Sequence, residues 1–429
     1  METLNRVYDL IKNGYKPCTD SRLANEKSIF FALKGENFDG NLFAKEVLEK
    51  GAKLAVCDNP SIGNLPGLIH VPNTLNFLQN LARHHRKQLT IPVIGLTGSN
   101  GKTTTKELLQ AVLSKNYNAF ATQGNLNNHI GVPLSILSVN EQHQIAIIEM
   151  GANHIGEIEA LCSIAQPTHG IITNIGKAHL EGFGSFEGVK KAKTELYAFL
   201  AKTNGTVFVN SKNQILLERI NHFDLYNIIE YNNYLLNAEV DKPENNLLSL
   251  SISINNTKLR VSTQMAGEYN MENILAAICI GQFFNVTIEN CLDAISEYTP
   301  SNNRSQIVNT AKNIIVLDAY NANPTSMEAA LTNFYSTPSK KPKALILGEM
   351  LELGEYSHEE HKKIFTQAST LFSSIYTVGE EYRDTSKSIN WFRDVHSLKM
   401  YLREYPLENH FILVKGSRGV KLEEVLEEL

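Results

Sequence analysis

The segment IPVIGLTGSNGKTTTKELL, residues 91–109, constrains the fold more than any other part of the chain. It begins with an apolar run that is typical of a buried strand, and a helical pattern starts at Lys102, directly after a glycine-containing turn. A strand, a tight turn and a helix in this order point backbone N–H groups at an anion, and the helix dipole favours negative charge there. The segment therefore predicts a phosphate-binding loop within an α/β domain.

The residue types in this loop match the needs of a bound nucleotide. Gly98 and Gly101 lack a Cβ atom, so the backbone can approach a phosphate closely. Lys102 is long enough to reach the outer phosphates, and the Thr103 hydroxyl can ligate Mg²⁺. The general motif G-x-x-x-x-G-K-[ST] requires glycine at position 96, where this chain has leucine, so the loop is a variant of it. The other residues that we expect to bind nucleotide are Ser99, Asn100 and Thr104.

Short apolar runs, each followed by a turn and a helical pattern, recur along the chain. Because these runs are apolar on both faces, they predict parallel sheets covered by helices, which is the α/β class. Between 205–210 and Met265 the apolar residues alternate, which predicts antiparallel strands within or beside the middle domain. The predicted buried strands are 91–97, 144–150, 170–175, 205–210, 313–318, 343–350, 374–379 and 410–416.

The chain length and two polar, turn-forming segments predict three domains. At about 150 residues per domain, a chain of this length has two to four. One boundary follows the basic run 83–87, which we expect to be the solvated end of a helix, and a second lies in the polar segment 297–305. The predicted domains are 1–87, a small α/β domain, 88–300, which carries the phosphate loop, and 301–429.

Composition excludes several classes of protein. The net charge of −5 argues against a nucleic-acid binder. The sequence contains neither a signal-peptide core nor an apolar run long enough to insert in a membrane. The 5 cysteines are widely spaced without a C-x-x-C pair, so we expect no disulfide framework and no zinc site. A monomeric protein in the reducing cytoplasm is the expectation.

Two ionisable side chains follow predicted strands. Glu149 ends the strand 144–150, where a buried carboxylate is costly unless it is paired or bound to metal. His179 lies in the glycine-rich loop after the strand 170–175. We expect both to bind Mg²⁺, and because Mg²⁺ prefers oxygen, a histidine ligand suggests a second ion. A salt-bridged glutamate and a structural histidine are the alternatives.

Three other groups of polar residues remain ambiguous on their own. Asn270 and Asn273 share one face of an apolar helix, where an amide could read a purine edge or cap the helix. In the helix after His179 the ordinary interpretation of a lysine cluster, Lys190, Lys191 and Lys193, is a solvated face. The third group surrounds the ends of two predicted strands. Its cations suit a phosphate or an anionic substrate group, but ordinary turn chemistry also explains them. The group comprises Arg304, Asp318, Asn321, Asn323, Ser326, Lys415, Ser417 and Arg418.

Taken in chain order, these motifs resemble the Mur ligase family. The resemblance covers the chain from about residue 17 to residue 419. It is carried by TGSNGKTT (97–104), TQGNLNNHIGVPLSIL (122–137), EMGANHIGEI (149–158), TNIGKAHLEGFGS (173–185), KAKTELY (191–197), GEYNMEN (267–273), DAYNANPTSMEAAL (318–331) and LVKGSRG (413–419). YNANP (320–324) with ILGEMLELGEYSHEEH (346–361) looks like one branch of the family.

The resemblance implies a cofactor set. It implies that the loop from Gly98 to Thr104 binds ATP, with Lys102 as a catalytic residue. It implies that Mg²⁺ ions, which we expect to number two, are held by Glu149, His179 and Thr103. Lys193 matches a lysine that is carbamylated in the family and becomes an anionic oxygen ligand, which would replace the solvated-face interpretation. Asn273 would contact adenine, and the residues expected at phosphate and ribose are Arg304 and Asp318.

The resemblance also implies substrate contacts. CTDSR (18–22) and FFALKGENFDG (30–40) look like uridine-nucleotide-binding segments, which assigns Ser21, Arg22 and Lys34 to that role. The expected contacts to the muramoyl peptide and the acceptor are Asn127, Asn128, Asn321, Asn323, Lys415 and Arg418. Asn41, where the family often has histidine, and Ala319, where an acidic–serine pair is common, are departures that weaken individual contacts.

The implied fold is α/β in three domains, with a central P-loop ATPase domain, a small N-terminal α/β domain and a C-terminal Rossmann-like domain that closes over ATP. The implied activity is ATP-driven amide ligation. YNANP (320–324) favours the branch that joins D-alanyl-D-alanine to UDP-N-acetylmuramoyl-tripeptide. The alternatives are a sister ligase that adds the third residue, a folylpolyglutamate synthase-like ligase, and a non-catalytic nucleotide-binding regulator.

Overall fold

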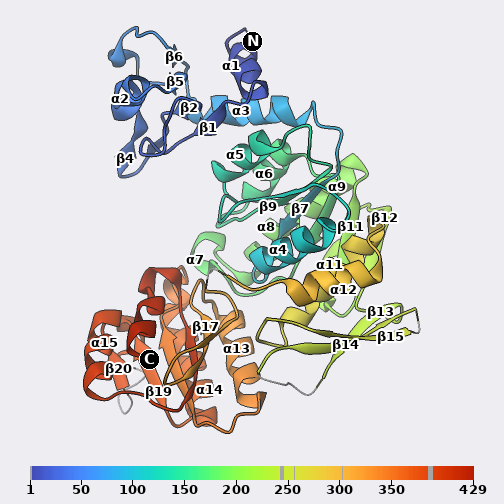
Figure 1. The fold of residues 1–429 in the computed structure, drawn as a ribbon, viewed down its shortest axis with the longest axis vertical. Coiled ribbons are helices and arrows are strands. Elements are labelled where there is room, and N and C mark those ends of the chain that lie inside the picture. Colours follow the sequence, from blue (N-terminus) through green and yellow to red (C-terminus); the bar gives the residue numbers. More distant parts are fainter. Residues whose placement is uncertain (1, 242–245, 256, 302, 385–389) are drawn as a thin grey trace. The chain divides into compact units, whose positions relative to one another are not determined.

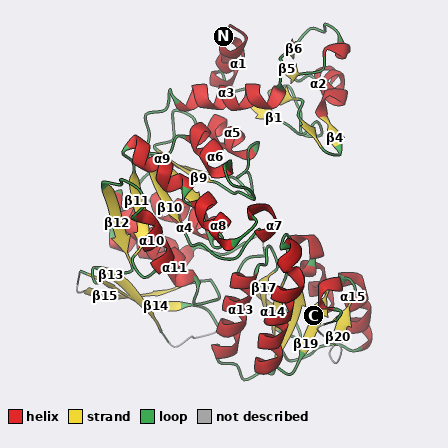
Figure 2. Ribbon diagram, turned by 180° about the vertical axis from the view of Figure 1, so that it is seen from behind, coloured by secondary structure: helices red, strands yellow, loops and turns green. Residues whose placement is uncertain are grey.

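The computed structural model describes residues 2–241, 246–255, 257–301, 303–384 and 390–429. Strands and helices alternate along the chain, and the larger sheets contain parallel strand pairs, so the predicted α/β class is confirmed (Figures 1 and 2). The chain forms two compact units, 1–95 with 117–151 and 157–169, and 96–116 with 152–156 and 170–429. The three domain boundaries stay predictions; residue 302, in the expected linker 297–305, lies outside the described residues.

The N-terminal part of the chain contains a four-stranded parallel sheet. Its order is β1 (Lys16–Cys18), β2 (Ser28–Phe31), β5 (Leu54–Cys57) and β6 (Leu68–His70), and the hairpin β3 (Lys34–Gly35) and β4 (Phe38–Asp39) stands apart from it. A small core of Phe30, Ala32, Ala44, Val47, Ala55 and Cys57 joins this sheet to α2 (Ala44–Glu49). These strands were not predicted, because three or four residues carry too little periodicity.

The basic end of α3 (Thr74–Arg86) is solvated only in part, because Lys87 is exposed whereas His85 and Arg86 are buried, which corrects the expectation for the run 83–87. Arg86 is only 6% exposed, and its guanidinium donates to the carbonyl oxygens of Ala165 and Gln166 at 2.8 and 2.9 Å. These carbonyls lie at the C-terminal end of α6 (Glu157–Ala165), where helix carbonyls lack partners within the helix. Arg86 therefore caps the C-terminal end of α6, and these hydrogen bonds compensate for the burial of its positive charge.

A six-stranded sheet follows, in the order β12, β11, β10, β7, β9, β8. All the predicted strands of the middle segment are confirmed within it. Three further strands, whose alternating pattern was also predicted, form an antiparallel sheet, β13 (Leu236–Val240), β14 (Ser249–Ile254) and β15 (Thr257–Ser262). The strands of the larger sheet are β7 (Val93–Thr97), β8 (Ala119–Ala121), β9 (Ile145–Glu149), β10 (His169–Ile172), β11 (Thr206–Asn210) and β12 (Asn227–Tyr231).

The C-terminal segment forms a second six-stranded sheet, in the order β16, β17, β21, β18, β19, β20. Only the β16–β17 pair is antiparallel among the pairs of this sheet in the described residues. Its strands are β16 (Gln306–Asn309), β17 (Ile314–Asp318), β18 (Lys343–Gly348), β19 (Ile375–Val378), β20 (Asn390–Phe392) and β21 (Phe411–Lys415), which confirms the predicted strands 313–318, 343–350, 374–379 and 410–416.

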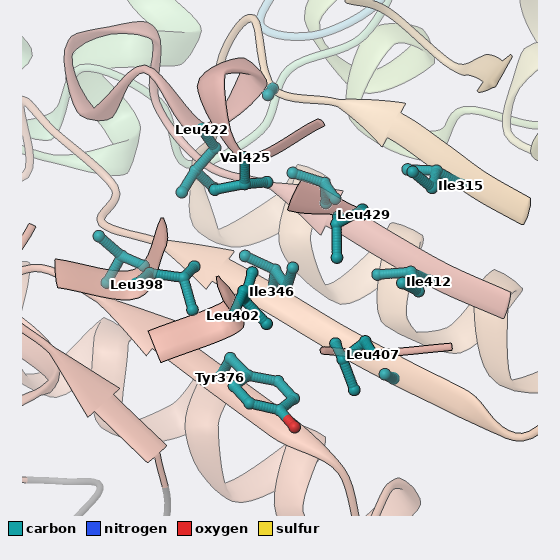
Figure 3. Packing of buried hydrophobic residues seen from close by; sticks show 14 of the residues in the cluster. Ile315, Ile346, Tyr376, Leu398, Leu402, Leu407, Ile412, Leu422, Val425 and Leu429 are labelled. Atoms are coloured by element: carbon teal, nitrogen blue, oxygen red, sulfur yellow. The ribbon is translucent and has the colours of Figure 1, made fainter. Parts of the chain in front are cut away.

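The core of this sheet is built from residues of the strands, of α15 (Val395–Glu404) and of the C-terminal 3₁₀ segment (Leu422–Glu428). Figure 3 shows Ile346 and Ile412 from adjacent strands in one cluster with Leu398 of α15 and Val425 of the C-terminal 3₁₀ segment. These apolar side chains are 0% exposed. On the remaining side, α13 (Pro324–Ser336) and α14 (Ser357–Leu371) pack against one another, as Figure 2 shows.

The remaining helices are short to medium in length, and no described helix is both long and apolar enough to cross a membrane. They are α1 (Glu2–Lys12), α4 (Lys102–Leu113), α5 (Gly131–Ser138), α7 (Leu180–Phe183), α8 (Phe186–Lys193), α9 (Glu195–Thr203), α10 (Gln214–Ile220), α11 (Asn270–Phe283), α12 (Ile288–Glu297), α13 (Pro324–Ser336), α14 (Ser357–Leu371) and α15 (Val395–Glu404).

His361 of α14 ties the loop after β18 to its helix. Its side chain is fully buried, its Nε2 accepts from the Met350 N–H at 2.9 Å, and its Nδ1 lies 2.7 Å from the Ser357 carbonyl oxygen. This pairing requires a neutral ring protonated on Nδ1, and burial lowers the pKa of His361. As the pH falls, His361 therefore binds a second ring proton less readily in the folded state than in the unfolded state.

We expect the free energy of unfolding to fall as the pH drops below about 6.5, the pKa of an unfolded histidine. Between about pH 7.5 and about pH 5 the His361 contribution reaches at most about 2 kcal/mol. Urea unfolding, followed by the fluorescence of the single tryptophan, Trp391 in β20, measures it. His361→Leu has no titrating ring at this position, so its stability should depend less on pH than that of the wild type. Equal dependence would contradict this role.

Candidate active site

The loop between β7 and α4 has a backbone that requires glycine at two positions. Gly98 has φ +146°, and a Cβ there would lie 2.0 Å from Oγ1 of Thr173. Gly101 has φ +77° at the N-terminal boundary of α4, and a Cβ there would lie 2.6 Å from Oδ1 of Asn273. Both glycines therefore meet a conformational requirement and a steric one set by Thr173 and Asn273, and the expected close approach of the backbone to a phosphate stays a prediction.

The segment after β10 holds this loop in place. Oγ1 of Thr173 donates to the Asn100 carbonyl oxygen at 2.6 Å, and the Asn100 N–H donates to Oδ1 of Asn174 at 2.9 Å. Oγ of Ser99 donates to the Gly176 carbonyl oxygen at 3.0 Å and accepts from the Gly176 N–H at 2.9 Å. The loop is thus shaped before a ligand binds. Thr173 and Asn174 lie in the motif TNIGKAHLEGFGS, but their role as supports was not predicted.

Lys102 lies over its own loop. Its ammonium donates to the carbonyl oxygens of Gly98 and Ser99 at 2.7 and 3.2 Å. Thr103 and Thr104, the next residues of the helix, are 6% and 8% exposed. A positive charge and the N-terminus of α4 therefore lie together, as anion binding requires.

Asn273 lies beneath the loop, on the face of α11 that it shares with Asn270 as predicted. Its Oδ1 accepts from the Thr105 hydroxyl at 3.0 Å, and its Nδ2 donates to Oδ1 of Asn270 at 3.0 Å. Asn270 in turn donates to the Ala266 carbonyl oxygen at 2.7 Å. The amide therefore supports the nucleotide loop in this structure, and its expected contact with adenine stays a prediction.

His179 precedes α7 in a left-handed conformation with φ +52°. Its Nδ1 lies against the carboxylate of Glu352, in the loop after β18. The contact with His179 holds the pKa of Glu352 below its usual range. Glu352 lies in the motif ILGEMLELGEYSHEEH, but no role was assigned to it, because the contact joins segments far apart in sequence.

Lys193, the last residue of α8, is 1% exposed, unlike its exposed neighbour Lys191. Its ammonium donates to the Ala152 carbonyl oxygen at 3.3 Å and lies 5.2 Å from the centre of the Phe183 ring. The solvated-face interpretation therefore fails for this lysine. Carbamylation of Lys193 stays a prediction.

Glu149, in the other compact unit, ends β9 and is 1% exposed. Nδ2 of Asn127 donates to its Oε1 at 2.8 Å, and its own N–H donates to the Thr122 hydroxyl at 3.0 Å. Oδ1 of Asn128 accepts from the Gly131 N–H at 2.9 Å, at the start of α5. Both predicted substrate asparagines thus have protein partners here, and Asn127 orients the carboxylate.

The predicted uridine-nucleotide residues lie in the loop between β1 and β2, for Ser21 and Arg22, and in β3, for Lys34. The exposed Arg22 pairs with Asp20 at 2.6 Å and lowers the pKa of Asp20 to about 2, while Ser21 between them is 8% exposed. Lys34 pairs with Asp39 at 3.5 Å. Asn41, the departure noted above, is 2% exposed and bridges Asp39 and Asp58 through its Nδ2 at 2.8 and 2.9 Å.

The C-terminal strand ends bring together cations around Asp318 and Tyr320. Lys415 of β21 pairs with Asp318 of β17 at 2.5 Å, and these residues are direct neighbours in the parallel register. The guanidinium groups of Arg304 and Arg418 lie 3.7 and 5.2 Å from the centre of the Tyr320 ring. Cation–π attraction holds both arginines near the strand ends. Tyr320 was not predicted to have a role.

The YNANP loop joins these strand ends to the nucleotide loop. Asn323 caps α13 in a capping box with Ser326, and its Nδ2 donates to Oδ1 of Asn100 at 2.7 Å. The Lys177 N–H donates to the Thr325 hydroxyl at 3.0 Å. The Asn321 side chain accepts from the Ala322 N–H at 3.0 Å. Asn323 thus acts as a cap and as a link between loops, in addition to its expected role at the substrate.

Comparison with known proteins places this geometry in context. Residues 96–281 match the family model described as the Mur ligase middle domain, and residues 303–418 match the Mur ligase, glutamate ligase domain. The UDP-N-acetylmuramoyl-tripeptide–D-alanyl-D-alanine ligase of Bacillus subtilis (strain 168) is 33% identical over 427 residues, covering 96% of this chain and 92% of the relative.

Two solved structures are similar over nearly their whole length. MurF from Acinetobacter baumannii has a TM-score of 0.86 and 28% identity, covering 98% of both chains. The MurF ligase from Thermotoga maritima in complex with ADP has a TM-score of 0.87 and 27% identity, covering 98% of this chain and 97% of that one.

Gly98→Ala should destabilise the loop, because the new Cβ would meet Thr173 and the φ is one that side chains rarely adopt. We expect a loss of about 1–3 kcal/mol in the free energy of unfolding, which denaturant titration measures. Gly35→Ala, where a Cβ would meet nothing within 4 Å, is the matched control. Equal stability of the two variants would refute the requirement for glycine at 98.

Proposed function

The chain belongs to the Mur ligase family, and we propose that it joins D-alanyl-D-alanine to UDP-N-acetylmuramoyl-tripeptide with ATP, in cytoplasmic peptidoglycan precursor synthesis. The name of the Bacillus subtilis relative supports the reaction, and the ADP complex of the Thermotoga maritima relative supports the nucleotide. We further propose that the enzyme acts as a monomer.

One observation carries the proposal most directly. The nucleotide loop is shaped by hydrogen bonds from the segment after β10, and Asn323 links it to the YNANP loop of the C-terminal sheet. Lys102 therefore lies near a second loop that begins beside the Asp318–Lys415 pair. A nucleotide on the first loop and an anionic reactant near the second would meet cations from both.

The proposed reaction has two steps. An oxygen of the tripeptide's terminal carboxylate attacks the γ-phosphorus of ATP, and ADP leaves with the electrons of the broken P–O bond. The amine nitrogen of D-alanyl-D-alanine then attacks the acyl carbon, loses a proton, and expels inorganic phosphate to leave an amide. Lys102 would neutralise negative charge that develops on the transferred phosphoryl group, because preorganised cations act most strongly where that charge appears.

The residues proposed to hold Mg²⁺ fit a hard cation in part. Glu149 offers a buried carboxylate, Thr103 offers a hydroxyl, and Lys193 would offer oxygen once carbamylated. His179 would complete the set through its imidazole. When bound, the proposed pair of ions would supply further charge neutralisation at the transferred phosphoryl group.

The assay that tests this function is phosphate release with ATP, a tripeptide nucleotide and a panel of amine acceptors. D-Alanyl-D-alanine should support turnover, and single amino acids, including glutamate, should not. The tripeptide nucleotide is supplied with lysine or with diaminopimelate at its third residue, which identifies the preferred one. In a parallel reaction with the nucleotide that lacks the third residue, turnover with a single amino acid would favour a sister ligase. ATP binding without acceptor-dependent release would favour a regulator.

Within the same assay Lys102→Ala should lower turnover by roughly 10²–10³, the usual cost of removing a preorganised electrostatic group. The exposed Lys191→Ala on α8 serves as the control for removing a lysine. Near-wild-type turnover in Lys102→Ala would reject the role of this residue.

Lys193→Ala should lose turnover because it removes the proposed carbamate oxygens. Short carboxylic acids such as acetate can enter the space left by the side chain and supply an oxygen ligand, so we expect them to restore part of the activity. Phosphate release at increasing acetate concentration measures this rescue. Full activity without acetate would rule out the carbamate role.

A further inference from the structure

The loop that follows β18 reaches the histidine proposed to bind metal. Nδ1 of His179 lies against Oε2 of Glu352, and the Glu352 carboxylate is half exposed while the His179 side chain is 19% exposed. Both residues have left-handed backbones, with φ of +52° and +64°. Non-glycine residues adopt this conformation at a cost of about 1–2 kcal/mol, so it persists where the surrounding contacts specify it.

Backbone contacts fix the two loops together next to this pair. The Glu181 N–H donates to the Glu352 carbonyl oxygen at 3.3 Å, and the Tyr356 hydroxyl donates to the Gly184 carbonyl oxygen at 3.3 Å. Gly354, with φ +55°, packs so closely on Glu181 that an added Cβ would lie 3.1 Å from its side chain. The Glu352 carboxylate therefore reaches His179 from a held loop.

A second ion pair joins the same segments. Nζ of Lys177 pairs with Oε1 of Glu360 in α14 at 2.9 Å, and the Glu360 side chain is 5% exposed. At the other end of the loop, His361 holds the Met350 N–H. The loop that carries Glu352 is thus held at both of its ends, by the His361–Met350 hydrogen bond and by the Lys177–Glu360 ion pair. A chance surface contact would not need such support.

We propose that Glu352 is a positioning residue for metal binding by His179, which it holds with Nδ1 protonated and the Nε2 lone pair available to the ion. This inference rests on the proposed function, since the metal role of His179 belongs to that proposal. A carboxylate bound to the second ring nitrogen is the usual way in which a metal-binding imidazole is oriented and made more basic. Because Glu352 lies against Nδ1, the Nε2 lone pair is the one that can reach an ion.

The proposal has a consequence for assembly of the site. Glu352 lies on the C-terminal sheet's loop, whereas His179 follows β10 of the preceding sheet. Metal affinity should therefore depend on the contact between these loops, even though Glu352 itself need not touch the ion.

The first test measures Mn²⁺ binding to the full-length protein with ADP by electron paramagnetic resonance, with Mn²⁺ as the probe for the Mg²⁺ site. Removing such a supporting group weakens metal binding by about 10–100-fold, which we expect for Glu352→Ala. Glu352→Gln keeps an acceptor without the charge and should lie between Glu352→Ala and the wild type. Glu355→Ala, an exposed glutamate in the same loop, should bind Mn²⁺ like the wild type.

The second test reads the tautomer of His179 by ¹⁵N nuclear magnetic resonance, with its signal assigned by its absence in His179→Gln. We expect Nδ1 to be protonated in the wild type and the Nε2-protonated form to appear in Glu352→Ala. A loss of Mn²⁺ affinity with an unchanged tautomer, or wild-type affinity in Glu352→Ala, would overturn the proposal.

Failure of the proposed function gives a different result. Unchanged Mn²⁺ binding in His179→Gln would remove the metal role of His179, and with it the inference about Glu352. Absence of acceptor-dependent phosphate release in the wild type would instead reject the ligase reaction while leaving the Mn²⁺ and tautomer results as evidence for the histidine–glutamate pair.

Discussion

The hydrogen bonds between the nucleotide loop and the segment after β10 are the constraint on which the site depends. Gly98 adopts a backbone that only glycine tolerates there, and Thr173 fills the space beside it. Thr173 and Asn174 then hold Asn100, which in turn accepts from Asn323. Removing one contact in this series would release the next, so the shape of the phosphate-binding backbone and the place of the YNANP loop are coupled.

At two buried charged residues, the sequence pattern predicts solvent exposure but the tertiary structure buries the side chain. Lys193 and Arg86 both lie in basic runs that resemble solvated helix faces, yet they are 1% and 6% exposed. Each has carbonyl partners contributed by distant segments, at Ala152 for the lysine and at Ala165 and Gln166 for the arginine. A buried charge is tolerable only with such partners, and sequence spacing does not reveal them.

The predicted buried strands of the middle and C-terminal segments are present, because a run that is apolar on both faces has few other ways to bury its surface. The short strands β1, β2, β5 and β6 were missed, since pairing with neighbours rather than internal periodicity stabilises them. Among site residues, the glycines and Lys102 could be predicted from spacing within one turn. Tyr320 and Glu352 could not, because their partners lie far away in sequence.

The sequence by itself determined the strand–loop–helix unit, the α/β class and the family, because these depend on residues within a few positions of one another and on motifs in order. Only the tertiary structure decided what each polar side chain contacts. In that structure Asn273 contacts Thr105, Asn127 contacts Glu149, and Glu352 contacts His179. The physical reason is that hydrogen bonds and ion pairs act over a few ångströms, and which groups come that close depends on how the whole chain packs.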